Sequence, residues 1–444
     1  MIVWCSAVRK LACWGSGLPY RRRVMPADAY LDLAGCGAGR RSPLRVAIVG
    51  AGVAGPAAAT LLARQGHHVD VFERATPLAP VGAGLLLQPT GMHVLHRLGL
   101  LDQALQLGHR IDLLIGDTES GRRVLELAYA DLDDRLFGLG MHRGALFAML
   151  LNAMAQETLV RVHAGLTIES VHQSHAHVTL RAASGQLLGP FDLLVIADGA
   201  RSRLREQLDI ASRSERYPYA AAWFTLPMPA HARWHATLRQ VYRDTRGMVG
   251  YLPVGRPSRD ADAMISVFWS LPADTIDATR HAGLAQLERD LIGLDPHAAA
   301  LLMHLRDMRQ VVFATYHDTV CERVHHHRVV LLGDAAHAMS PQLGQGANLA
   351  LVDAASLADA IAQRPLDVPG ALAMHDELRR DHVAFYARAS RWLTPWFQSP
   401  WSALAIPRDL LMRPLSRVPW IKRQMAESLA GVKTGVLSAY PLPL

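Results

Sequence analysis

The chain has 444 residues, half of them hydrophobic, which is enough for a large core and for two or three domains' worth of structure. No run of about 18 uncharged apolar residues occurs, so no membrane-spanning helix is predicted. The net charge of +7 lies at the two ends, because residues 1–44 and 391–444 each carry +5, which leaves −3 for residues 45–390. This distribution argues against nucleic-acid binding, which needs a basic stripe on the folded part.

The basic extension at residues 1–44 comes first in chain order. Its three arginines at 21–23 are not followed by an apolar segment of the length found in secretion signals. We therefore expect a disordered leader, or a true start of translation further downstream. Three of the four cysteines lie in this extension, which leaves Cys321 alone in the remainder. A single cysteine cannot form a disulfide framework, so a cytoplasmic protein is predicted.

Residues 45–73 have the pattern of a strand, a helix and a second strand. Val46–Val49 is a short apolar run typical of a buried parallel strand, Ala57–Arg64 is rich in Ala and Leu, and Val69–Phe72 is another apolar run. Together they predict a βαβ unit of about thirty residues. The elements predicted next are helices at Pro89–Leu98 and Leu146–Gln156 and strands at Val178–Leu180 and Phe191–Ile196.

The sequence pattern of residues 217–320 differs from that of the preceding residues and predicts a separate antiparallel sheet. Its strands are expected at Ala220–Phe224, Gln240–Tyr242, Gly247–Tyr251 and Ala263–Trp269. A helix is predicted at Leu284–Ile292. A buried strand then returns at Val329–Leu332 and leads into a helix at Gln345–Ile361. The chain is therefore expected to leave a first domain, build a second one and come back.

The first motif is the Gly-rich turn between the strand and the helix of the βαβ unit. Gly50 permits a tight turn, Gly52 lets a pyrophosphate approach the backbone, and Gly55 lets the helix pack closely on the sheet. The helix start offers free N–H groups to phosphates. Glu73 ends the second strand, where a carboxylate can accept the ribose hydroxyls of an adenosine. The turn predicts a dinucleotide site, to which we also assign Val53, Ala54 and Arg74; the alternative is a merely structural turn.

Two further motifs each follow a predicted buried strand. Asp198–Arg205 follows Leu193–Ile196, and Gly333–His337 follows Val329–Leu332 and continues through Pro341 to Gly344–Asn348. These segments resemble the DG and GD motifs of the class A flavoprotein monooxygenases, the family of para-hydroxybenzoate hydroxylase. More remotely, the chain is similar to ubiquinone-biosynthesis hydroxylases, salicylate hydroxylases and quinolone monooxygenases. The resemblance covers about residues 45–390, and it implies that the dinucleotide is FAD.

The third motif suits a flavin on chemical grounds as well. Asp334, just past a strand end, can accept the ribityl hydroxyls. Gly344–Asn348, with Gly346 and Ala347 inside it, lies at a helix start, where N–H groups can stabilise the negative charge of a reduced flavin. The alternative is an ordinary strand–helix turn with glycine caps. We expect His337 to support this turn, although a role as catalytic base is the tempting alternative.

The resemblance also implies roles for residues outside these turns. Asp198 and Arg205 would serve the FAD pyrophosphate and NAD(P)H, with a helix-start ion pair as the alternative. Arg143 would contact the flavin's phosphate or ribose, unless it is a solvated helix-end arginine. Gly84 and Gln88 resemble the family's loop beside the flavin.

The resemblance implies an α/β fold with a Rossmann-like (GR2-type) FAD-binding domain. This discontinuous domain is expected at residues 45–216 and 321–390, with an inserted, mainly antiparallel substrate domain at 217–320. The implied reaction uses NAD(P)H to reduce FAD, and O2 then forms a flavin C4a-hydroperoxide that hydroxylates an electron-rich carbon (an EC 1.14.13-like activity). No catalytic side chain can be named. Candidate residues lining the pocket for an aromatic or hydrophobic substrate are Trp223, Tyr251 and Trp269, each of which could instead be plain core.

Other functions compatible with the motifs are another flavoenzyme of this fold, such as a reductase or halogenase, and a flavin-binding protein without turnover. The chain lacks a Cys-x-x-Cys pair and a Trp-x-Trp-x-Ile-Pro segment, which argues against a disulfide reductase and weakens the halogenase hypothesis. No metal site is predicted, because the adjacent histidines at 325–327 point to different sides and have no further ligand at a suitable spacing.

The C-terminal segment, residues 391–444, is predicted to be helical and holds four of the nine tryptophans among basic residues. Aromatic and basic residues together occur at membrane surfaces, so peripheral membrane contact is one interpretation. The other is a helical tail packed on the domain or on a second subunit. The sequence does not distinguish a monomer from a homodimer.

Overall fold

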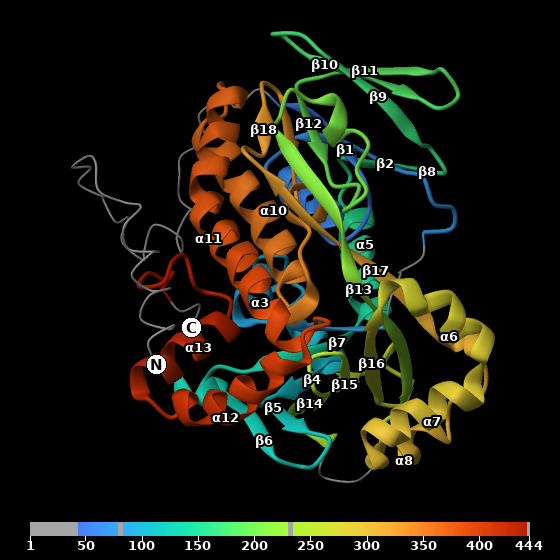
Figure 1. Cartoon of the computed structure of the whole chain (residues 1–444). Helices are drawn as coiled ribbons and strands as arrows, with labels where there is room; N and C mark the ends of the chain where they lie inside the picture. The colour runs from blue at the N-terminus through green and yellow to red at the C-terminus, as the bar shows by residue number, and fades with distance from the viewer. Residues whose placement is uncertain (1–42, 79–82, 230–233, 442–444) are drawn as a thin grey trace. The chain divides into compact units, whose positions relative to one another are not determined.

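The structure is a computed structural model that describes residues 43–78, 83–229 and 234–441. The predicted extension at residues 1–44 therefore lies almost wholly outside the described residues. Figure 1 shows the described part of the chain as two main sheets joined by long helices.

The first main sheet has six strands in the order β18-β19-β12-β1-β2-β8. Its strands are β1 (Arg45–Val49), β2 (His68–Glu73), β8 (Val160–Ala164), β12 (Leu193–Ile196), β18 (His325–His326) and β19 (Val329–Leu331). All neighbouring pairs are parallel except β18–β19. A parallel sheet of this kind is covered on both faces, which explains why its central strands are continuous apolar runs.

Helices cover one face of the six-stranded sheet, and a small sheet covers the other. The helical face packs against α2 (Ala54–Arg64), α5 (Arg143–Gln156) and α10 (Gly346–Gln363). The opposite face packs against a three-stranded sheet formed by β9 (Ile168–Gln173), β10 (Val178–Ala182) and β11 (Leu187–Phe191). All four strands predicted between residues 45 and 196 belong to these layers.

The second main sheet has seven strands in the order β17-β13-β16-β15-β14-β5-β6. Its strands are β5 (Leu113–Thr118), β6 (Arg123–Ala128), β13 (Ser212–Pro227), β14 (Thr237–Arg243), β15 (Gly247–Gly255), β16 (Met264–Pro272) and β17 (Val312–Cys321). Five of them come from the segment predicted as a separate antiparallel sheet. The structure adds β5 and β6, which come from a part of the chain expected in the first domain, so this sheet is built from two separate stretches of sequence.

The two faces of the seven-stranded sheet have different neighbours. The outer face packs against α6 (Ile276–Ala282), α7 (Leu284–Leu294) and α8 (Ala299–Leu302), through side chains such as Phe224, Val249 and Val267. The inner face contacts a small sheet of β3 (Gly84–Leu87), β4 (His109–Ile111) and β7 (Gly138–His142) at one end. At its other end, Tyr242 and Met248 of the inner face pack on Phe397.

The C-terminal region is helical and packs on the rest of the chain. Helix α11 (Val368–Phe397) runs alongside α10, and it is followed by α12 (Ala405–Ser416) and α13 (Pro419–Leu429), which lie beside β5 and β6 (Figure 1). The guanidinium of Arg408, on α12, is buried and donates hydrogen bonds to the carbonyl oxygens of Asp244 and Trp396. Among the described residues, no helix has the length and apolar character needed to cross a membrane.

Candidate flavin and substrate site

The three sequence motifs follow three neighbouring strands of the six-stranded sheet. Strand β12 lies between β1 and β19, and Ile196 pairs with Val49 on one side and Leu331 on the other. Because all three strands are parallel, their carboxyl ends meet at one edge, and the loops that follow them lie side by side. A ligand at the carboxyl edge of a parallel sheet is the usual arrangement for nucleotide-binding α/β folds.

The Gly-rich turn has the backbone that a bound pyrophosphate needs. Gly50 has φ +105°, and a Cβ there would collide with the backbone of Ala197. A Cβ on Gly55 would collide with the carbonyl of Gly50, whereas one on Gly52 would meet no atom within 4 Å. Gly52 is exposed and precedes the start of α2. Free N–H groups at a helix start beside an exposed glycine fit the diphosphate of FAD.

Glu73 lies at the end of β2, next to this turn. Its Oε2 accepts a hydrogen bond from the N–H of Ala51 at 2.9 Å, and its Oε1 accepts one from the N–H of Ala75 at 2.9 Å. The carboxylate is thereby fixed in orientation while each oxygen keeps a lone pair for a ribose hydroxyl. Arg74, the next residue, is exposed.

The second motif contains one open acceptor and one buried cation. Asp198 is half-buried, and its Oδ1 has no hydrogen-bond partner among the described residues. Burial raises the pKa of Asp198, against the opposing effects of Ser202, Arg205 and Arg74. Buried acceptors of this kind are normally satisfied, so a donor on a bound ligand fits here. Arg205 is 2% exposed and donates to the carbonyl of Ala335 at 2.9 Å, which ties the second motif to the third.

The third motif presents a carboxylate beside a helix start. Asp334 is the exposed first residue of α9 (Asp334–His337). Its Oδ1 lies 3.9 Å from the point where a Cβ on Gly346 would stand, at the start of α10. Gly344 has φ +62°, is exposed, and has open space around its missing Cβ. This bare backbone next to Asp334 fits the ribityl chain and ring of a flavin.

Asn348 and Gln88 form a hydrogen-bonded pair next to this helix start. Asn348 accepts a hydrogen bond from the N–H of Gln88 at 2.8 Å and donates to the carbonyls of Leu86 and Gly344, both at 3.1 Å. The Gln88 side chain is fully buried and accepts from the Tyr129 hydroxyl. Both residues therefore lie beside the predicted flavin loop with their side chains engaged by protein, except that Nε2 of Gln88 has no hydrogen-bond partner among the described residues.

His337 belongs to a buried polar chain. Its Nε2 lies 2.6 Å from Asp353, whose other oxygen accepts a hydrogen bond from Arg379 at 2.8 Å. Arg379 contacts His382, which in turn contacts the carbonyl of Gly431 at 2.7 Å. Burial alone would raise the pKa of Asp353, but His337 and Arg379 hold it well below its usual range. This environment suits support of the turn, as expected, better than proton transfer to a substrate.

Arg143 starts α5 and faces the same space as the third motif. Its side chain lies among many protein atoms, which lowers its pKa, while Asp334 and Tyr316 oppose that effect. It is nevertheless exposed to solvent. An arginine that is both surrounded by protein and accessible suits an anionic or oxygen-rich ligand.

The remaining predicted cofactor residues lie around these features. Val53 precedes α2 and Ala54 opens it, Pro341 opens a short 3₁₀ turn before Gly344, Ala347 lies in the first turn of α10, and Gly84 opens β3 against Val254 and Ser266. All the cofactor assignments stay predictions.

Of the predicted substrate-lining residues, Trp223 lies on the inner face of the seven-stranded sheet, in one row with Phe268. Tyr251 and Trp269 lie on the outer face among the side chains that pack on α6–α8.

The inner face also brings in Tyr316, which the sequence analysis missed. Its hydroxyl accepts a hydrogen bond from Trp223 Nε1 at 2.7 Å. No sequence signal marks it, because it lies in β17 opposite an irregular stretch of β13 between Arg216 and Ala220. In the described part of the chain, no group of three or more His, Cys, Asp or Glu residues is arranged to hold a metal ion.

Comparison with known proteins agrees with this geometry. A family model described as an FAD binding domain matches residues 43–367. The chain belongs to this family. It is 30% identical over 394 residues to 3-amino-4-hydroxybenzoate 2-monooxygenase of Streptomyces cremeus, covering 83% of this chain and 92% of that one. It is 28% identical to 6-hydroxynicotinate 3-monooxygenase of Bordetella bronchiseptica, covering 79% and 92% of the two chains.

Solved structures show the same fold. Klebsiella pneumoniae HpxO, in a complex with FAD and uric acid, aligns with a TM-score of 0.75 at 23% identity, over 88% of this chain and 98% of that one. A probable FAD-dependent monooxygenase from Pseudomonas aeruginosa aligns with a TM-score of 0.70 at 25% identity, over 83% and 99% of the two chains. The predicted α/β fold, the FAD cofactor and the membership in the FAD-dependent monooxygenases are thus confirmed.

Proposed function

We propose that this FAD-dependent monooxygenase uses NAD(P)H and O2 to hydroxylate an electron-rich aromatic substrate held between the third motif and the inner face of the seven-stranded sheet. The observation that supports this proposal is the convergence of the three motif loops at one sheet edge, beside Arg143. Arg143 lies near Asp334 and near half-buried Tyr316, which Trp223 contacts. The relatives named above act on ring compounds that carry hydroxyl and carboxyl groups, which is the substrate chemistry we assign to this chain.

Within this proposal the residues have distinct tasks. The turn at Gly50–Gly55 and the start of α2 hold the pyrophosphate, and Glu73 holds the adenosine ribose. Asp334 would hold the ribityl chain, and Gly344–Asn348 would bind the ring through its backbone. The bound flavin supplies the redox chemistry and the activation of O2. The protein's own contribution is to hold the reacting carbon close to the flavin and to keep water out.

The test begins with purified full-length chain, which should be yellow. NADH and NADPH are added separately, with and without 3-amino-4-hydroxybenzoate, 6-hydroxynicotinate and related acids. A substrate should accelerate flavin bleaching, consume O2 and yield a product with one added oxygen atom. Bleaching without any oxygenated product across the panel would count against hydroxylation and favour a reductase.

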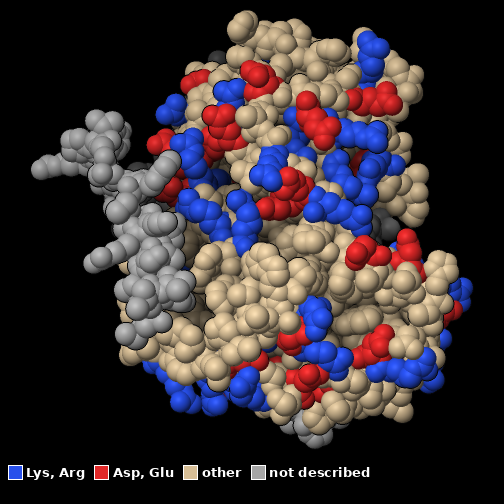
Figure 2. Space-filling model, in the orientation of Figure 1, with Lys and Arg blue, Asp and Glu red and all other residues tan. Residues whose placement is uncertain are grey.

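We also propose that the C-terminal segment contacts an anionic lipid surface. Ile406 and Leu410 are 64% and 56% exposed on one face of α12, and Arg413 and Arg417 continue that face. Neither arginine has an ion-pair partner among the described residues, whereas nearby Asp409 is paired with Arg408. Figure 2 shows basic atoms gathered next to a surface without charged residues at the lower left, where Figure 1 places α12 and α13. Apolar and unpaired basic groups on one helix face match an anionic membrane surface.

Flotation with vesicles of phosphatidylglycerol or of phosphatidylcholine tests this contact. The chain should float with the anionic vesicles, and Leu410→Ser should reduce the floated fraction. The matched control is Leu366→Ser, since Leu366 is 85% exposed elsewhere on the surface. Light scattering on the same samples distinguishes a monomer from a homodimer, and a dimer lost in Leu410→Ser without any vesicle binding would overturn the lipid proposal.

A further inference from the structure

The inner face of the seven-stranded sheet carries a row of aromatic side chains next to the third motif. Trp223 on β13 pairs with Phe268 on β16, and Phe268 pairs with Gly250 on β15, so the three positions share one face. The rings of Trp223 and Phe268 lie 5.1 Å apart between centroids. Phe268 covers the space that a Cβ on Gly250 would need. An aromatic wall results, with Trp223 and Phe268 both half-buried.

The direction of one hydrogen bond at this wall is fixed by chemistry. The indole Nε1 of Trp223 can only donate, so in its 2.7 Å bond to Tyr316 the hydroxyl oxygen of Tyr316 is the acceptor. That oxygen carries one proton of its own, which must point elsewhere. None of the described residues accepts it in a hydrogen bond. Tyr316 thus presents an O–H donor whose orientation is set by Trp223.

The charges around Tyr316 favour an acceptor that carries negative charge. Burial raises the pKa of the Tyr316 hydroxyl to about 12, although the hydrogen bond from Trp223 and the nearby charge of Arg143 both act to lower it. The hydroxyl therefore stays protonated at neutral pH and keeps its role as a donor. Arg143 is exposed and offers further donors towards the same space. A ligand oxygen placed there would meet two donors, one of them cationic, and hydrogen bonds to charged oxygens are the stronger kind.

We propose that Tyr316 is a specificity-determining residue whose hydroxyl, oriented by Trp223, donates a hydrogen bond to an anionic oxygen of the aromatic substrate. The anionic oxygen is a phenolate or a ring carboxylate, whose hydrogen-bonding chemistry is the same. This inference rests on the proposed function, since it names the group by which the hydroxylated substrate is recognised. It assigns Tyr316 to substrate recognition and leaves FAD binding to the motif loops.

The experiment compares Tyr316→Phe with the wild-type FAD-loaded enzyme. Probes are 3-amino-4-hydroxybenzoate and 6-hydroxynicotinate, each paired with its methyl ether and its carboxamide. We expect Tyr316→Phe to keep its FAD and to raise the KM of one acid about tenfold or more, the usual scale for a hydrogen bond to a charged group. The analogue that lacks the recognised anionic oxygen should bind weakly to both enzymes, and the substitution should change its KM less than threefold.

Two further variants separate recognition from a general loss of structure. Trp223→Phe removes the donor that orients the hydroxyl, so it should raise the same KM by a smaller factor and increase the share of NAD(P)H consumed without product. Tyr242→Phe is the matched control, since Tyr242 also lies on the inner face and bonds Gln240, but it is buried at the far end against Phe397. It should leave KM unchanged.

The outcomes are distinct. If the wild type hydroxylates a probe and Tyr316→Phe does so with an unchanged KM, this inference is wrong while the proposed function stands. Loss of FAD from Tyr316→Phe, with Tyr242→Phe intact, would place the hydroxyl on the cofactor and overturn it as well. If the wild type oxygenates none of the probes, the proposed substrate class falls, and the role of Tyr316 falls with it.

Discussion

Two regions of the molecule are stabilised in different ways. One is the motif edge, the carboxyl edge of the six-stranded sheet where the three motif loops lie, and the other is the C-terminal tail, residues 391–441. At the motif edge, the important atoms belong to the backbone, as at Gly50 and Gly344, where positive φ angles and missing Cβ atoms shape the loops. In the C-terminal tail, the important atoms belong to long side chains that reach distant partners. The first kind of structure leaves a local pattern in the sequence, and the second does not.

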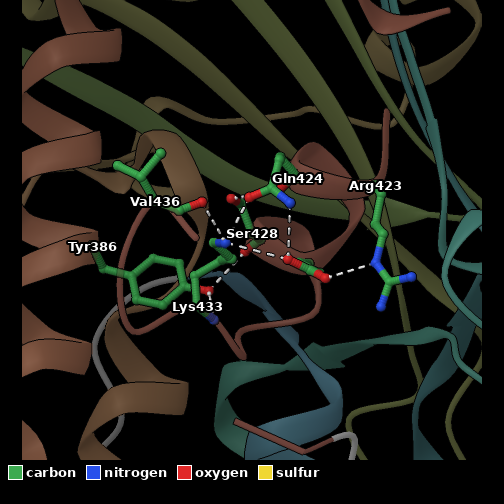
Figure 3. Close-up of polar contacts among 7 residues, drawn as sticks. Tyr386, Arg423, Gln424, Ser428, Lys433 and Val436 are labelled. Carbon is green, nitrogen blue, oxygen red and sulfur yellow. Dashed lines mark hydrogen bonds and ion pairs between the residues drawn. The ribbon is translucent and has the colours of Figure 1, made fainter. Parts of the chain in front are cut away.

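Lys433 shows how the tail is fixed. Its side chain is almost fully buried, and its ammonium group donates to Gln424, Glu427 and the carbonyl of Val436 at 2.6, 3.2 and 2.9 Å (Figure 3). All three of its protons thus have acceptors, which is the condition under which a buried cation is tolerated. The Tyr386 hydroxyl joins the same region, accepting from the Lys433 N–H and donating to Ser428.

The tail in turn contacts the third motif. The side chain of Gln345, one residue before α10, donates to the carbonyls of Ser428 and Leu429 at the end of α13. His382 contacts the carbonyl of Gly431. The C-terminal tail is therefore coupled to the flavin-side helix start, in line with the interpretation that it packs on the domain. Variants in each region can test whether the motif edge and the C-terminal tail differ in this way. They can also test whether these contacts couple the two regions.

The largest effect is expected at the motif edge. Glu73→Arg replaces an acceptor of two backbone N–H groups with a cation and removes the proposed ribose ligand. FAD retention should fall more than a hundredfold, measured as the flavin absorbance that remains after gel filtration. Circular dichroism checks that the variant folds. Normal flavin content in a folded Glu73→Arg protein would remove Glu73 from the proposed site.

The next effect belongs to the tail. Lys433→Met leaves Glu427 with only the exposed Arg423 as a cation and leaves the acceptors of Gln424 and Val436 without their donor, which should lower the free energy of unfolding by about 3–5 kcal/mol. Arg423→Met is the matched control because Arg423 pairs with the same Glu427 at 3.0 Å from a side chain that is 68% exposed. It should cost about 0–1 kcal/mol. Urea denaturation measures both, and equal costs for the two variants would show that burial does not distinguish these ion pairs.

Acid should weaken the packing of α11 on α10, where His375 of α11 is buried against Ser356 of α10. His375 is 1% exposed, contacts Ser356, and burial lowers its pKa to about 4 from 6.5. Because the unfolded state binds this proton more readily, stability is full above about pH 6.5 and is lost as pH falls towards 4. By linkage, His375 alone should lower the free energy of unfolding by about 2 kcal/mol between pH 7.5 and 5. His375→Gln should reduce the loss by that amount, whereas the exposed His281→Gln should not; an unchanged pH profile would refute the role of His375.

The difference between the two regions also explains which features could be predicted from sequence. The loop could be predicted from Gly50, Gly52 and Gly55, because its backbone needs glycine at these closely spaced positions. Which aromatic residues face the flavin side could not be predicted, because Trp223 and Trp269 sit on neighbouring strands whose register decides the face, and Trp269 pairs with Ala222 rather than Trp223. The position of Tyr316 could not be predicted for the same reason, because it depends on an irregular pairing of β17 with β13.

The smallest predicted effect concerns the contact between the motif edge and the C-terminal tail. Gln345→Ala removes two side-chain hydrogen bonds to the end of α13 and frees the turn before α10. The cost in unfolding free energy should be about 1 kcal/mol, but the dissociation constant of FAD should rise severalfold because the helix start beside Gly344 loses its tether. Gln65→Ala is the matched control: its side chain also donates to α10, at Ala358, far along the helix from Gly346. A similar loss of stability with unchanged FAD affinity is expected there. Equal FAD affinities for the two variants, measured by flavin fluorescence, would mean that the tail supports the fold without shaping the flavin site.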